Sequence, residues 1–269
     1  MSLRILFVAS EMAPLMKVGG LADVIQGLPA ALDALGHDVR VLMPAYADVR
    51  APARVLVKTY QASAACAGTS LFEVRSADSP VPVWLIDGPG FGDRPGNPYV
   101  DRKGQPYPDN AARFNRLCEV ASAIAGNACG LDWQPNVVHC HDWHAGLTPV
   151  WMRLNQVPAA SVFTIHNLGY QGLFPRDMFA VLKLPERLWH YQSLEFHGQL
   201  SFMKGGLVFS DRLTTVSPNY AGEILTDSYG CGLQGVLSER AADLTGILNG
   251  IDATYWNPET DTWLAHTYS

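Results

Sequence analysis

The strongest constraint on the fold is a repeated alternation of strand-like apolar runs with segments of helical periodicity. The first run, LRILFVA at residues 3–9, is almost continuously apolar, as in a strand that is covered on both faces. Apolar residues then recur at steps of three and four from Leu21 to Leu35, which predicts one face of a helix. Such alternation predicts an α/β fold of the Rossmann-like type, a mainly parallel sheet with helices on both faces.

The same alternation continues to residue 249. Pro29 predicts a kink or a break in the first helix, and Gly36 predicts its end. Residues 51–90 indicate a hairpin or extra edge strands. No linker-like stretch divides the chain, so we expect one domain over residues 1–269. Further strands are predicted at 38–44, 136–141, 159–166, 211–217 and 244–249, and further helices at 110–126, about 144–155, 201–210 and from Pro218.

The composition narrows the classes of function. A formal net charge of −6 disfavours binding of nucleic acid through a broad basic surface. No apolar run reaches the ~18 residues of a membrane-spanning helix, and residues 1–10 lack a signal-peptide pattern. The five cysteines are odd in number and widely spaced, which is typical of free thiols in a reducing compartment. We therefore expect a cytoplasmic protein with no membrane or nucleic-acid partner.

Polar residues gather where the predicted strands end. In open parallel sheets, ligands bind outside the carboxyl ends of the strands. The stretches after these ends are rich in His, Asp, Asn and Tyr, which a purely structural protein has no obvious reason to collect at one edge. The candidate site is therefore built from residues 10–20, 87–99, 141–144, 166–170, 217–220 and 249–252.

The stretch HCHDWHAG at residues 139–146 has three interpretations. His139 and His141 alternate on a strand and face the same way, with Asp142 next, which is compatible with a zinc or iron site. Alternatively His139 is a core residue bonded within the sheet and Asp142 caps the following helix. In the third interpretation Asp142 and its neighbours contact a polar ligand that is not a metal.

A second strand end, TIHNLGYQG at residues 164–172, carries His166 and Asn167. The imidazole of His166 is suited to act as an acid or a base, or to hydrogen-bond a hydroxyl-rich substrate. A histidine that only caps a strand is the structural alternative.

The turn PLMKVGGLADV at residues 14–24 is neither of the common phosphate-binding patterns. The order G-x-x-x-x-G-K-[ST] is absent, and about nine residues separate the first strand from Gly19 and Gly20, which disfavours an NAD-dependent dehydrogenase. Glycines still allow backbone N–H groups to approach an anion at a helix N-terminus, and Lys17 adds a positive charge. The turn is therefore a candidate anion site.

Together these segments resemble a known family. The sequence is similar to bacterial glycogen synthase and plant starch synthase, the ADP-glucose-dependent α-1,4-glucan glucosyltransferases. The motifs occur in the family's order and extend over nearly the whole chain. They are SEMAPLMKVGGLADV, LGHDVRVLMP, DRPGNPY, VVHCHDWHAG, FTIHNLGYQG, SFMKGGL, TVSPNYA and LNGIDATYWNPETD.

The resemblance implies a GT-B-type architecture of two facing Rossmann-like domains with the active site between them. Residues 1–269 would be the N-terminal, acceptor-side domain, and the C-terminal nucleotide-binding domain would be absent from this chain. The chain alone is then expected to lack turnover. Because the nucleotide base would be read by the other domain, the choice between ADP-glucose and UDP-glucose is not settled by these residues.

The resemblance also implies roles for single residues. Glucose would pass from ADP-glucose to an α-1,4-glucan (glycogen) with retention of configuration, without a cofactor or a metal. His166 would contact the sugar at the reacting centre, and Asp142 would orient the sugar or the acceptor. The other implied substrate-binding residues are Lys17, Gly19 and Gly20 near the diphosphate with Glu11 and Asp23 beside them, and Tyr99, Asn167 and Asn249 on the glucose and acceptor side.

Two alternatives from other classes remain. The domain could bind glucan without turnover, as a binding module. It could also be a metal-dependent hydrolase built on His139, His141 and Asp142.

Overall fold

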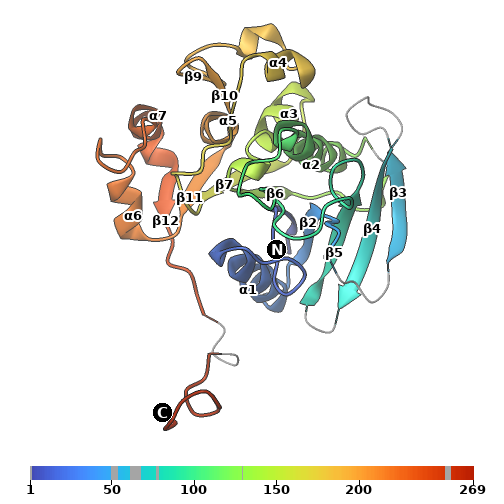
Figure 1. The fold of residues 1–269 in the computed structure, drawn as a ribbon, viewed down its shortest axis with the longest axis vertical. Coiled ribbons are helices and arrows are strands. Elements are labelled where there is room, and N and C mark those ends of the chain that lie inside the picture. Colours follow the sequence, from blue (N-terminus) through green and yellow to red (C-terminus); the bar gives the residue numbers. More distant parts are fainter. Residues whose placement is uncertain (1, 50–53, 61–67, 77–78, 129, 252–255) are drawn as a thin grey trace.

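The computed structural model describes residues 2–49, 54–60, 68–76, 79–128, 130–251 and 256–269. Within these residues the dominant feature is a nine-stranded sheet with the strand order β12-β11-β7-β6-β1-β2-β5-β4-β3 (Figure 1). A smaller three-stranded sheet has the order β8-β10-β9.

The main-sheet strands are β1 (Arg4–Val8), β2 (Asp38–Pro44), β3 (Val55–Tyr60), β4 (Thr69–Ser76), β5 (Ser79–Asp87), β6 (Val137–His141), β7 (Ala160–Ile165), β11 (Arg212–Thr215) and β12 (Leu244–Gly246). The small sheet comprises β8 (Leu173–Phe174), β9 (Glu195–Phe196) and β10 (Gln199–Ser201). The α-helices are α1 (Gly20–Ala34), α2 (Asn110–Ala125), α3 (Thr148–Leu154), α4 (Asp177–Val181), α5 (Phe202–Phe209), α6 (Pro218–Glu223) and α7 (Gln234–Glu239). Short 3-10 turns are η1 (Trp143–Ala145), η2 (Glu186–Leu188) and η3 (Ala241–Asp243).

The predicted parallel sheet is confirmed. Neighbouring strands are parallel from β12 through to β5, whereas β4 is antiparallel to both β5 and β3. The predicted hairpin is therefore β4 and β5, which with β3 extends one edge of the sheet. Residues 77–78 of this hairpin lie outside the described part of the chain.

Both faces of the sheet are covered, which accounts for the continuous apolar runs. Leu6, Phe7 and Val8 of β1 have no exposed surface, although successive side chains of a strand point to opposite faces. Figure 1 shows α1 on one side of the sheet and α2 and α3 on the other. The core therefore consists of two layers, one on each face.

Two helix predictions differ from the structure, and both involve proline. The first helix is not broken at Pro29: α1 runs through it, because Pro29 lies on the buried face with Leu21 and Ile25, where packing offsets the lost backbone hydrogen bond. The predicted helix at 144–155 is divided into η1 and α3. Pro149 sits in the first turn of α3, and its ring would clash with the carbonyl four residues earlier in an uninterrupted helix.

At the C-terminal end, β12 is shorter than its predicted strand, and residues 256–269 lie away from the main sheet (Figure 1). Trp263 in this segment has 95% of its surface exposed. None of the helices in the described ranges is long and apolar enough to span a membrane.

Candidate functional site

The site lies where the strand order of the main sheet reverses. From β1 the chain builds towards β2 and β5 on one side, and β6, β7, β11 and β12 follow on the other side. At such a switch point the connecting segments diverge and leave a crevice at the carboxyl ends of the strands. Glu11 follows β1, Asp142 follows β6 and His166 follows β7, so the sheet brings the predicted residues to one edge.

Glu11 ties the glycine turn to a distant loop. Its carboxylate is buried, and Oε2 accepts hydrogen bonds from the backbone N–H groups of Val18 at 2.6 Å and Gly19 at 3.0 Å. The other oxygen, Oε1, accepts from the hydroxyl of Tyr99 at 2.5 Å. One of the amides that we expected to approach an anion, that of Gly19, is therefore occupied by a carboxylate of the protein itself. The predicted anion site then depends on Lys17 and Gly20.

Lys17 pairs with Asp23, one turn into α1. The Nζ and Oδ1 atoms are 2.6 Å apart, and the two side chains are 51% and 53% exposed. Exposed ion pairs of this kind contribute at most about 1 kcal/mol, so a ligand phosphate can displace the carboxylate at low cost. Gly20 is the first residue of α1.

Tyr99 joins the ends of β1 and β6. Its hydroxyl lies 2.7 Å from Oγ of Ser10, and its ring stacks on His144 with 4.5 Å between ring centroids. Burial raises the pKa of Tyr99 well above its ordinary value, with the charge of Glu11 as a further cause, so the phenol is neutral and donates to the carboxylate.

Arg113 of α2 holds the loop that carries Tyr99. Its guanidinium is almost fully buried and donates to the carbonyl of Pro98 at 3.0 Å and to Oδ1 of Asn110 at 2.8 Å. Asn110 in turn donates to the carbonyl of Tyr99 at 2.8 Å. Arg113 was missed at the sequence level because an arginine in a helical pattern is usually exposed.

Asp142 connects the ends of β6 and β7. Its Oδ1 accepts from the backbone N–H of His166 at 2.8 Å and from that of Asn167 at 3.4 Å. The side chain makes no capping bond to η1, so the N-cap interpretation is wrong. Burial raises the pKa of Asp142 to about 7. Its backbone has φ +55° and ψ −177°, a region that costs about 1–3 kcal/mol for a residue other than glycine and is often found at functional sites.

His166 is half-buried, and its Nε2 lies 2.9 Å from Nδ1 of His141. Burial lowers the pKa of His166 to about 4, so the ring is neutral near pH 7. His139 lies 2.6 Å from Oγ1 of Thr164 through Nε2, and burial lowers its pKa to about 3. The predicted hydrogen bond of His139 within the sheet is therefore confirmed, whereas its side chain is half-buried and not part of the fully buried core.

The metal interpretation gains no support from this geometry. His139 and His141 do face the same way, with 4.2 Å between their ring centroids. Each, however, turns a ring nitrogen to a protein partner, Thr164 or His166. Across the described residues, no group of three or more His, Cys, Asp or Glu side chains is placed to hold a metal ion.

The two remaining predicted residues, Asn167 and Asn249, are exposed. Asn167 is exposed, and its Oδ1 accepts from the backbone N–H of Gly169 at 2.9 Å. Asn249 is exposed beyond β12, the strand at the edge of the sheet. Neither residue contributes to the buried part of the cluster.

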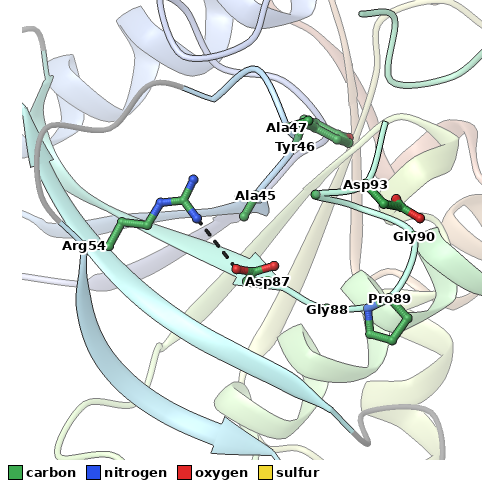
Figure 2. A pocket seen from close by; sticks show the side chains of 10 residues that line it. Ala45, Tyr46, Ala47, Arg54, Asp87, Gly88, Pro89, Gly90 and Asp93 are labelled. Carbon is green, nitrogen blue, oxygen red and sulfur yellow. Dashed lines mark ion pairs between the residues drawn. The ribbon is translucent and has the colours of Figure 1, made fainter. Parts of the chain in front are cut away.

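A cavity of about 380 Å³ opens at the ends of β2 and β5, on the same edge of the sheet (Figure 2). Arg54 and Asp87 face each other across it, with 3.7 Å between Nη1 and Oδ2. Its other lining residues are Ala45, Tyr46, Ala47, Gly88, Pro89, Gly90, Gly92 and Asp93.

Comparison with known proteins gives one consistent family. Residues 4–239 match the model of a family described as the starch synthase catalytic domain. The chain is 52% identical over 266 residues to Glycogen synthase 1 of Methylococcus capsulatus, covering 99% of this chain and 54% of that protein. It is 51% identical over 270 residues to Glycogen synthase of Thioalkalivibrio sulfidiphilus, covering 99% of this chain and 56% of that protein.

Among solved structures, the catalytic domain of Starch Synthase IV from Arabidopsis thaliana bound to ADP and acarbose is similar. The TM-score is 0.81 and the identity 28%, with 100% of this chain and 56% of that chain covered. The chain thus spans about half the length of the proteins it matches.

Proposed function

Because the chain belongs to the starch synthase catalytic-domain family, we propose that it is the acceptor-side half of a retaining glucosyltransferase. Glucose passes from ADP-glucose to the non-reducing end of an α-1,4-glucan such as glycogen. A second, nucleotide-binding domain completes the site and supplies the other contacts to the donor. The observation that carries this proposal is the convergence of Glu11, Tyr99, Asp142 and His166 at the switch point of the sheet.

On the donor side, Lys17 exchanges its exposed partner Asp23 for the diphosphate. Glu11 holds the glycine turn in place through Val18 and Gly19, which leaves Gly20 at the start of α1 to face the phosphates. A cation beside a helix N-terminus stabilises the negative charge that grows on the departing diphosphate.

On the sugar side, the site must bind a glucose that becomes oxocarbenium-like as ADP departs. The acceptor hydroxyl attacks the same face that ADP leaves. His166 and Asp142 hold the sugar and the acceptor at the reacting centre, and Asn167, Tyr99 and Asn249 contact hydroxyl groups around it. Fixed polar groups of this kind act by positioning and by electrostatic stabilisation, and no cofactor or metal is required.

The nucleotide and the compartment are part of the same proposal. The solved relative from Arabidopsis thaliana is bound to ADP, which supports ADP-glucose over UDP-glucose as the donor. Cys118 and Cys140 are buried free thiols, which suits a reducing cytoplasm.

The experiment compares the chain alone with the chain fused to the C-terminal half of Glycogen synthase 1 of Methylococcus capsulatus, its 52% identical relative. Transfer of radiolabelled glucose from ADP-glucose to glycogen is measured for both. We expect transfer by the fusion protein and none by the chain alone. A folded fusion protein that binds glycogen without transfer would favour the glucan-binding module instead.

A further inference from the structure

A buried histidine and a half-buried histidine meet in the candidate site. His141 of β6 has no exposed surface, and its Nδ1 lies 2.9 Å from Nε2 of His166. Its other nitrogen, Nε2, is buried and has no hydrogen-bond partner among the described residues. The roles proposed above do not use His141.

Each ring of this pair carries one proton. Burial lowers the pKa of His141 well below its ordinary value and that of His166 to about 4, so both imidazoles are neutral at neutral pH. A neutral imidazole has one nitrogen that donates and one that accepts. In a hydrogen bond between the two rings, one therefore donates and the other accepts, which allows only two arrangements.

The two arrangements differ at the unpartnered Nε2 of His141. If His166 donates, the proton of His141 must sit on Nε2, where a buried N–H would have no acceptor. If His141 donates from Nδ1, its Nε2 is a bare lone pair. Orphaned buried N–H groups are rarer in proteins than under-satisfied acceptors, because a donor taken out of water without a new acceptor loses its hydrogen bond outright.

The neighbouring rings do not accept a hydrogen bond from an N–H group at Nε2 of His141. Phe7 stacks on His141 with an interplanar angle of 15°, and His139 is tilted by 34°. Both rings therefore cover the face of His141, whereas an N–H bond lies in the plane of its ring and points past them. The arrangement in which His141 donates is favoured.

We propose that His141 is a positioning residue: it donates its Nδ1–H to Nε2 of His166 and thereby keeps the proton of His166 on Nδ1. His166 then presents an N–H donor on the side of its ring that faces away from His141. The bond from the backbone N–H of His166 to Asp142 fixes where this donor lies.

The consequence for catalysis rests on the proposed function. An Nδ1–H group donates to a sugar oxygen, whereas a bare Nδ1 would accept a proton as a general base. Of the two roles open to His166, acid–base catalysis or hydrogen bonding to a hydroxyl-rich substrate, the tautomer selects hydrogen bonding by donation.

The tautomer is measured directly by nitrogen-15 NMR of the histidine rings in the 269-residue chain at pH 8, without substrate. We expect His166 to show a protonated Nδ1 and a bare Nε2. His37 is an internal reference of the opposite kind, because its Nδ1 accepts from the backbone N–H of Leu3 at 3.1 Å and its proton must be on Nε2. A protonated Nε2 on His166 would overturn the proposal.

Two variants separate positioning from packing. The amide nitrogen of the side chain in His141→Asn stands near the position of Nδ1 and still donates, so His166 keeps its proton on Nδ1. His141→Asp has the shape of the Asn variant but its carboxylate can only accept a hydrogen bond, so the proton of His166 moves to Nε2. If His141→Asp is folded and leaves Nε2 of His166 without a proton, or if His141→Asn moves the proton from Nδ1, the proposal is wrong. If His141→Asp does not fold, the wild-type spectrum decides.

In the fusion protein, His141→Asp should lower kcat about ten-fold with little change in the KM for ADP-glucose, and His141→Asn should retain most of the wild-type kcat. This kinetic arm depends on the proposed function, whereas the spectra do not. An inactive fusion protein with the expected tautomer therefore counts against the glucosyltransferase and not against the role of His141.

Discussion

Oδ1 of Asp142 accepts a hydrogen bond from the backbone N–H of His166 at 2.8 Å, so the residue after β6 holds the residue after β7. Asp142 keeps this contact from a backbone conformation that residues other than glycine rarely adopt, and from a buried position that raises its pKa to about 7. The free-energy cost of this backbone conformation and of the buried carboxyl group is offset by the packing of the rest of the sheet. The carboxylate is thus held where it orders the end of a neighbouring strand.

This position predicts a pH-dependent stability. The pKa of Asp142 is about 7 when folded and about 3.9 in an unfolded chain, so the folded state retains a proton that the unfolded state loses. The associated stability is present below the unfolded pKa and is lost as the pH rises through about 7. Asp142→Asn keeps an acceptor oxygen but does not titrate. Urea unfolding should therefore show the variant gaining, relative to wild type, roughly 2 kcal/mol between pH 5 and pH 8.

The control for this prediction is Asp177→Asn in the short helix α4, away from the strand ends. Its stability relative to wild type should not vary between pH 5 and pH 8 by more than about 0.5 kcal/mol. If the difference in the free energy of unfolding between Asp142→Asn and wild type stays constant across this range, burial does not raise the pKa of Asp142.

Arg113→Met tests whether α2 orders the loop of Tyr99. The change leaves the buried carbonyl of Pro98 without its donor, but it also removes the cost of burying a charge, so the global free energy of unfolding changes little. Locally, hydrogen exchange of the Tyr107 amide, which donates to the carbonyl of Tyr99, should become about ten-fold faster. Arg153→Met, an exposed arginine of α3, should leave that amide unchanged.

Gly146→Ala tests the close approach of η1 and α5. A Cβ at Gly146 would lie 2.1 Å from the backbone oxygen of Phe202, so the backbone must move, at a cost of about 3 kcal/mol. Gly27→Ala in the middle of α1 meets nothing within 4 Å and should stabilise the protein by about 0.5–1 kcal/mol. Thermal or urea unfolding distinguishes the two, and equal effects would contradict the packing of α5 on this turn.

Most of the main sheet was predictable because its strands are covered on both faces. The run at residues 38–44 matches β2 from end to end, since a doubly buried strand tolerates few polar residues within it. The break predicted at Pro29 is absent because local propensity is overridden where packing on the core is strong. The small sheet was not predicted, because strands as short as β8 carry no periodic signal.

The location of the site was also predictable, and its internal contacts were not. Topology alone places Asp142 and His166 on neighbouring strand ends. In contrast, the bond from Tyr99 to Glu11 joins residues 88 positions apart, and no local pattern shows that Glu11 occupies the amides of the glycine turn. His144 and Arg113 are likewise buried by tertiary contacts that spacing does not reveal.

Lys17 is proposed to bind the diphosphate of the donor and His166 the transferred glucose, so substitutions of the two residues should cause different kinetic defects in the fusion protein. Under the proposed function, Lys17→Ala removes the exposed cation that would contact the diphosphate, so it should raise the KM for ADP-glucose about ten-fold with a smaller effect on kcat. The matched control is Lys183→Ala, at an exposed lysine after α4, which should leave both constants unchanged.

Measurement of kcat and of the KM for ADP-glucose in the His166→Ala fusion protein tests whether His166 lies at the reacting centre. If His166 contacts the glucose as it is transferred, kcat should fall about a hundred-fold or more while the KM for ADP-glucose stays within about three-fold of wild type. Wild-type kcat and KM in a folded His166→Ala fusion protein would contradict the account, because the switch point of the sheet would then not be the reacting centre.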